Sequence, residues 1–162
     1  MEQWIDNFRQ LVCGSAPRLL SLPDELTVLP LGPGKWPAKE TIGHLIDSAA
    51  NNHQRFVRAQ FTSDLVFQGY DQEQWVISQH YNDEPWEHLV SLWKLYNLHL
   101  AHIMNGVSPA VRDQLRTEHT LDQIAFRTVE ASVPATLDYL MRDYIEHLKN
   151  HLDQIFTRFQ SE

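Results

Sequence analysis

The spacing of apolar residues along the chain predicts four long helices. We expect these helices over residues 2–20, 37–62, 83–105 and 135–160. In the last of them an apolar residue recurs every three or four positions, as in a helix that packs into a bundle. The residues of this apolar face are Leu137, Met141, Tyr144, Leu148, Leu152, Ile155 and Phe159.

Three less regular stretches, residues 22–37, 63–83 and 106–134, separate these helices. The first contains four prolines and two glycines, which are the residue types that most often interrupt helices. The other two are long for a compact domain, so we expect each to be functional or to fold onto the bundle. No stretch alternates between apolar and polar residues as a half-buried strand does. The sequence therefore predicts one all-α domain over residues 1–162, a four-helix bundle whose order is not simply up-down-up-down.

Composition narrows the class of protein. The 162 residues carry a formal net charge of -8, and no cluster of Lys and Arg indicates a nucleic-acid-binding face. No apolar run approaches the roughly 20 residues that cross a bilayer, and the first residues lack the pattern of a signal peptide. Cys13 is the single cysteine, and we interpret it as a small core residue. We expect a cytoplasmic protein without nucleic-acid or membrane partners.

Two pairs among the nine histidines have the spacing of metal ligands on one helix face. His147 and His151 are four positions apart, which turns the helix by only about 40° beyond a full turn. His99 and His102, three positions apart, are an alternative pair. A catalytic zinc-type site takes three protein ligands, so a third ligand must come from elsewhere. Asp143 lies one turn before His147 and could accept a hydrogen bond from its second ring nitrogen.

The motif "IGHLIDSA" offers His44 as the third ligand. His44, Asp47, Asn51 and Arg55 form a polar stripe on the side of the helix away from its apolar positions. By periodicity alone this stripe is a solvated helix face, and it becomes a site only if it lines a polar cavity. For the other histidines we expect a core position or contact with solvent: the first for His53, the second for His80, His88 and His119.

Four stretches together resemble the DinB-like superfamily, also called DinB/YfiT-like. They are "KWPAKETIGHLIDSAANNHQRF", "YDQEQW", "LVSLWKLYNLHLAHI" and "DYIEHLKNHLDQI". The resemblance covers residues 20–160 and is closest to the branch of bacillithiol S-transferases, once described as metal-dependent hydrolases. It implies a four-helix bundle in up-down-down-up order, often assembled as a homodimer.

The resemblance also implies a divalent metal site. Three histidines would hold the ion, which could be zinc, nickel or manganese: His44, His147 and His151. This assignment disfavours His99 and His102 as ligands. Asp47 would support the ligands without binding the metal.

A metal ion with an open coordination position can activate water for hydrolysis or a thiol for transfer to an electrophile. We therefore expect an enzyme that acts on a small molecule, with a low-molecular-weight thiol as one candidate partner. Candidate substrate-binding residues are Arg55, Tyr70 and Trp75. Alternatively, Tyr70 and Trp75 fix their connection to the bundle and Arg55 forms a surface ion pair. Two other functions stay open, a non-catalytic stress-related bundle that binds metal or a small molecule, and a structural dimerisation module.

Overall fold

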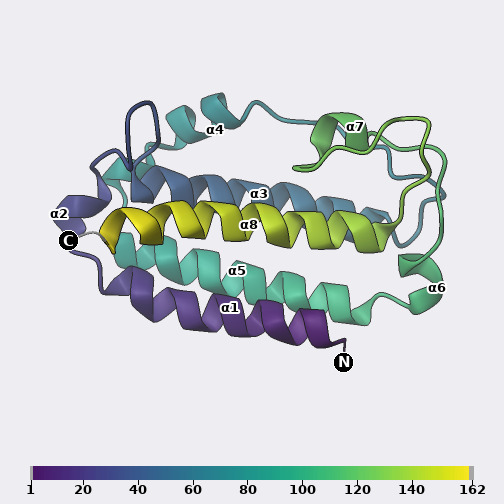
Figure 1. The fold of residues 1–162 in the computed structure, drawn as a ribbon, viewed down its shortest axis with the longest axis horizontal. Coiled ribbons are helices and arrows are strands. Elements are labelled where there is room, and N and C mark those ends of the chain that lie inside the picture. The colour runs from purple at the N-terminus through teal and green to yellow at the C-terminus, as the bar shows by residue number, and fades with distance from the viewer. Residues whose placement is uncertain (1, 161–162) are drawn as a thin grey trace.

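The structure, a computed structural model, describes residues 2–160, and the regular elements within these residues are helices joined by irregular connections. No β-strand occurs within these residues; the chain forms only isolated β-bridges. Four long helices make up the bundle (Figure 1): α1 (Gln3–Leu20), α3 (Ala38–Arg58), α5 (Trp86–Gly106) and α8 (Leu137–Phe159). The predicted all-α four-helix bundle is confirmed. In the described part of the chain, no helix is both long and apolar enough to cross a membrane.

The connections contain short helices that the apolar pattern did not predict: α2 (Asp24–Thr27), α4 (Gln72–Gln79), a 3₁₀ turn η1 (Tyr81–Asp83), α6 (Pro109–Arg112) and α7 (Leu121–Ile124). The expectation that residues 63–83 are irregular is wrong for α4. The Asp71 side chain accepts a hydrogen bond from the Gln74 N–H and so caps this helix. Only Val76 is buried within α4, so the sequence shows no helical period there.

The second long helix ends earlier than predicted, at Arg58. A guanidinium Nη of the buried Arg116 donates to the carbonyl of Ala59, 3.0 Å away, just beyond the helix end. Phe61, counted in the predicted helix, lies in the turn that follows and is 74% exposed. A cation at this end is favourable because the last carbonyls of a helix lack partners within the helix.

Side-chain contacts show that α3 and α5 run in the same direction. Near the start of both helices, Lys39 Nζ donates to the Glu84 carbonyl at 2.8 Å. About three to four turns further along both helices, His53 Nδ1 lies 3.2 Å from Tyr96 Oη. The two helices are therefore parallel neighbours, as Figure 1 also shows.

The other two long helices, α1 and α8, are also parallel. The Arg142 guanidinium lies over the Trp4 ring near the start of both helices, and the Arg18 guanidinium lies over the Phe156 ring near their ends. This pair runs opposite to α3 and α5 (Figure 1). The bundle thus brings the first turns of α3 beside the middle of α8, which is where the histidines lie.

The connections cover the outer side of α3 and α8. Figure 1 shows α4 and α7 on the face of the bundle opposite α1 and α5. Under this layer His44, Asp47 and Arg55 are only 0%, 2% and 6% exposed. The helical pattern alone favoured a solvated face here, and that interpretation is wrong because the crossing segments shield the polar stripe from solvent.

Candidate metal centre

Three histidine side chains converge between α3 and α8. The Nε2 atom of His147 lies 3.1 Å from His44 Nε2 and 3.1 Å from His151 Nε2. One nitrogen from each of the three rings lies within 4.8 Å of the others. The structure therefore brings together the three residues that the resemblance named. Among the described residues, no aspartate, glutamate or cysteine joins this group as a fourth potential ligand.

The protonation of these rings matches a cation site. Burial, and to a smaller extent the neighbouring histidines, lower the pKa of His44 and of His147 to about 3. Burial also lowers the pKa of His151. All three imidazoles are thus neutral at pH 7, which is the form that binds metals.

The hydrogen-bonding capacity of His147 gives a second test of whether the three histidines fit a metal ion. In a neutral imidazole, Nε2 carries either one proton or one lone pair. It can therefore make only one well-directed hydrogen bond, yet two other Nε2 atoms lie 3.1 Å from it. Nitrogens that share a tetrahedral zinc ion at about 2.0–2.1 Å are roughly 3.3 Å apart. A shared divalent ion accounts for this spacing better than a hydrogen-bonded trio does.

Aromatic rings flank the histidines. The Trp36 ring centroid lies 5.1 Å from that of His44, and the Phe126 centroid lies 5.4 Å from that of His147. Trp36 belongs to the stretch that carried the resemblance, but we assigned it no role from the sequence. Phe126 comes from the long connection before α8, and no sequence pattern indicated it. Both rings pack beside the histidines, and the cavity wall includes Phe126 together with His147 and His151.

Asp47 is held by the crossing segment, which is the connection between α3 and α5 (residues 59–85). Its Oδ1 accepts hydrogen bonds from Tyr81 Oη at 2.6 Å and from Gln79 Nε2 at 2.7 Å. Burial raises the pKa of the Asp47 carboxyl, and the two hydrogen bonds counteract part of that rise. The Tyr81 ring lies directly against Gly43, where an added Cβ would overlap it. Gly43 and Asp47 thus anchor the segment that covers His44.

Asp143 does not accept the hydrogen bond from His147 that the sequence analysis predicted. Its two carboxylate oxygens accept hydrogen bonds from the backbone N–H groups of Phe126 and Arg127, each at 2.7 Å. These bonds hold the connection before α8 in place, and with it the ring of Phe126. The helical spacing placed Asp143 correctly near the site but could not show that backbone groups from a distant loop would occupy it.

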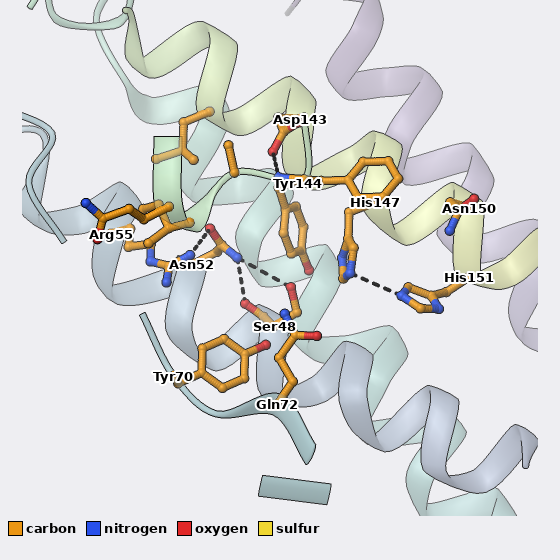
Figure 2. Close-up of a pocket in the computed structure, with 15 residues that line it drawn as sticks. Ser48, Asn52, Arg55, Tyr70, Gln72, Asp143, Tyr144, His147, Asn150 and His151 are labelled. Carbon is orange, nitrogen blue, oxygen red and sulfur yellow. Dashed lines mark hydrogen bonds between the residues drawn. The ribbon is translucent and has the colours of Figure 1, made fainter. Parts of the chain in front are cut away.

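A cavity of about 410 Å³ opens beside the histidines, and His147 and His151 form part of its wall. Figure 2 shows that α3 contributes Ser48, Asn52 and Arg55 to this cavity, and that the crossing segment contributes Tyr70 and Gln72. Arg55 and Tyr70, both candidates from the sequence, therefore line the cavity. Sequence analysis missed Ser48, Asn52 and Gln72 because single polar residues on a helix or loop have no distinctive spacing.

Trp75 does not line this cavity. It packs against Tyr70 at a centroid distance of 5.0 Å and is 39% exposed. It borders a neighbouring cavity of about 450 Å³, whose lining also includes Arg55 and Arg58. This agrees with the alternative in which Tyr70 and Trp75 fix the connection, although Tyr70 reaches the cavity as well.

The alternative histidine pair lies away from the cluster. His99 and His102 are exposed on α5, and the ring of His99 meets that of His53 at 5.2 Å. His53 is half-buried rather than a core residue and lies 3.2 Å from Tyr96 Oη. Among the described residues, only the cluster with His44 brings three potential ligands together.

Two other expectations from the sequence are wrong. His119 is buried, with Nε2 2.8 Å from the Val133 carbonyl, because the two long connections pair with each other at this point. Cys13 is exposed. The buried face of α1 includes Val12 and Ala16, and Cys13 falls just outside it.

Comparison with known proteins identifies the fold. No protein-family model matches the sequence, and no curated protein matches it. A solved structure does match, with a TM-score of 0.80 over 98% of this chain and 85% of that chain, at 14% sequence identity. It is described as YfiT from Bacillus subtilis, "a probable metal-dependent hydrolase with an unusual four-helix bundle topology". The chain therefore has the fold of YfiT, as the resemblance to DinB/YfiT-like proteins predicted.

Proposed function

We propose that this protein is a metal-dependent enzyme that acts on a small molecule, with a divalent ion held by His44, His147 and His151. The observation that carries the proposal is the convergence of three neutral imidazole nitrogens beside a cavity of about 410 Å³. The description of the YfiT structure as a hydrolase supports the same class of function. The cavity volume suits a small-molecule substrate.

The ligand set fits zinc, nickel or manganese. When bound by three neutral imidazoles, such an ion supplies a Lewis acid that lowers the pKa of a coordinated water or thiol. The protein holds its ligands on two long helices, α3 and α8, which are more rigid supports than loops. Trp36 and Phe126 pack beside the ligands, and Asp47 fixes the segment above His44.

Two reactions fit this site. Hydrolysis follows from an activated water and agrees with the description of YfiT. Thiol S-transfer follows from an activated thiol and rests on the sequence motifs shared with bacillithiol S-transferases. The homodimer is likewise a prediction from those motifs, which light scattering would test. The cavity wall carries several neutral polar side chains, among them Ser48, Asn52 and Gln72, and these would bind a polar substrate in either reaction.

The test is a turnover assay on metal-loaded, untagged protein. One arm combines a low-molecular-weight thiol with an electrophile such as monobromobimane, and the other uses nitrophenyl esters and amides. We expect metal-dependent turnover in one arm, lost in His151→Ala and retained in the matched control His102→Ala on the exposed face of α5. Turnover that persists in His151→Ala would contradict the proposal. A protein that binds metal but turns over neither set would instead support a non-catalytic metal-binding bundle.

A further inference from the structure

Arg55 is a buried cation without an acidic partner. Its side chain is only 6% exposed. Its guanidinium donates to Asn52 Oδ1 at 3.4 Å and to the Gln68 carbonyl at 3.2 Å, both neutral oxygens. No carboxylate of the described residues forms an ion pair with it. Burial lowers the pKa of the guanidinium, although arginine stays charged at neutral pH.

A buried, uncompensated charge is costly for a folded protein. Such a charge persists where it has a function, and Arg55 borders the cavity that His147 and His151 also line. The carboxylate of Asp143, which lines the same cavity, is already bound by two backbone N–H groups at 2.7 Å. The protein itself therefore supplies no free negative charge to Arg55 from this wall.

The positions of His44 and Arg55 on α3 indicate how far apart the metal site and the guanidinium lie along the helix. Eleven positions along a helix correspond to about three full turns, so both residues lie on one face of α3. The rise over eleven residues is roughly 16 Å. In Figure 2, Arg55 and the pair His147–His151 lie at opposite ends of the drawn cluster, with Ser48 and Asn52 between them. A ligand that reaches both ends must be elongated.

Neighbouring side chains hold the guanidinium ready for a ligand. The amide of Asn52 is oriented by its donation to the Ser48 carbonyl at 2.9 Å, which leaves Oδ1 to accept from Arg55. A guanidinium has five N–H donors in a fixed plane and binds carboxylates through two parallel hydrogen bonds. The two protein contacts leave donors available for an anion.

From these observations we infer that the substrate carries an acidic group, carboxylate or similar, remote from its reacting group, and that Arg55 binds this acid. That the other end of this substrate reacts at the metal rests on the proposed function. That its acidic group binds to Arg55 rests on the geometry of Arg55 alone. Arg55 is then a substrate-binding residue that selects elongated anions over neutral molecules of the same length.

The test compares linear dicarboxylates with their monoamides, for example suberate with suberamate, on metal-loaded protein by titration calorimetry. Each compound is titrated into the wild type and into Arg55→Gln. The monoamide removes one charge and the substitution removes its proposed partner, so the four affinities form a cycle that isolates their coupling. We expect the diacid to bind at least about tenfold more tightly than the monoamide in the wild type, and this preference to fall to about twofold in Arg55→Gln.

Arg58→Gln is the matched control. Arg58 lies one turn later on α3, is exposed, and lines the neighbouring cavity together with Arg55 but not the cavity beside the histidines. The same loss of charge there should leave the preference for the diacid unchanged. The Arg55→Lys variant keeps the charge without the planar fork, and we expect it to keep part of the preference. Metal content and thermal unfolding of each variant show that the protein is folded and loaded.

Absence of a preference for diacids in the wild type, at every chain length from succinate to dodecanedioate, would overturn the inference. A preference that survives in Arg55→Gln, or that depends on Arg58, would overturn it as well. Because the cycle measures binding and not turnover, its result is independent of the catalytic assay. A diacid preference that requires Arg55 in a protein without turnover would support the acid-binding end and contradict only the proposed reaction.

Discussion

His44 Nε2 and His147 Nε2 lie 3.1 Å apart, although 103 positions separate the two residues in the chain. The contact exists because α3 and α8 are neighbours that run in opposite directions, so the second turn of α3 meets the middle of α8. His151 completes the cluster one turn further along α8. His147 Nε2 can make only one well-directed hydrogen bond, yet two neutral imidazole nitrogens lie 3.1 Å from it, and this is the physical basis for the proposed metal centre.

Metal should stabilise the folded protein. A ligand that binds only the native state, at about 100 times its dissociation constant, adds roughly 2.7 kcal/mol to the free energy of unfolding. For a chain of this size that raises Tm by about 5–11 °C. We expect this shift when zinc or nickel is added to metal-free wild type, as followed by circular dichroism. His44→Ala should show no shift, while His102→Ala should shift like the wild type.

The stability of the metal-free protein should depend on pH in the acid range. Burial lowers the pKa of His147 to about 3 in the folded state, whereas an unfolded histidine titrates near 6.5. Between these values the unfolded chain binds the proton and the folded chain does not, so the free energy of unfolding falls as pH decreases. The slope is at most about 1.4 kcal/mol per pH unit for each such histidine. Above about pH 6.5 this contribution to stability is complete.

Urea denaturation in the presence of a chelator, between about pH 7 and pH 4, measures this slope. His147→Gln removes one titrating group and should give a shallower pH dependence than the wild type. His102→Gln, on the exposed face of α5, serves as the control. An equal slope in His147→Gln and the wild type would contradict the burial of a neutral His147.

Gly43→Ala should destabilise the protein and disturb the cover over His44. A Cβ at this position would overlap the Tyr81 ring, which packs directly against the helix there. Overpacking of this kind costs about 1–3 kcal/mol. Gly14→Ala in α1 is the matched control, because an added Cβ there meets nothing within 4 Å. The control should gain about 0.5–1 kcal/mol from the better helix propensity of alanine. Chemical denaturation measures the free energy of unfolding of both variants, which should decrease in Gly43→Ala and increase in Gly14→Ala.

Cys13→Ser should leave turnover nearly unchanged. Cys13 is exposed on α1, and a nucleophilic cysteine needs a base or a cation arranged to produce its thiolate. In the proposed mechanism the metal centre activates the water or thiol instead. We expect metal content equal to the wild type and kcat/KM within about twofold of it, as is usual for surface substitutions. A folded, metal-loaded Cys13→Ser variant without turnover would rule out the metal-centred mechanism.

The sequence predicted the four helices because each has an apolar face with a clear period. It did not predict α4, since a helix of eight residues with one buried side chain carries too weak a pattern. It also placed the polar stripe with His44 and Arg55 toward solvent, because periodicity describes one helix and not the segment that covers it. The motif around His44 offered it as a candidate third ligand beside His147, periodicity counted against this assignment, and the resemblance to DinB-like proteins decided for it.

The partners of the acidic residues could not be predicted either. Asp47 is bound by Tyr81 and Gln79 from the crossing segment, and Asp143 by backbone groups of residues 126–127. Contacts between a helix and a distant loop leave no spacing signal in a single sequence. The cavity could not be predicted for the same reason, because its wall combines residues of α3, α8 and both long connections.

The central claim is that three histidines bind one metal ion, and elemental analysis of untagged protein tests it most directly. The protein is loaded with zinc, nickel or manganese, freed of excess metal by desalting, and measured by inductively coupled plasma mass spectrometry. We predict about one ion per chain in the wild type and less than about a tenth of an ion in His147→Ala, because a site with two ligands loses most of its affinity. A wild type that retains no metal, or a His147→Ala variant that retains a full equivalent, would contradict the account.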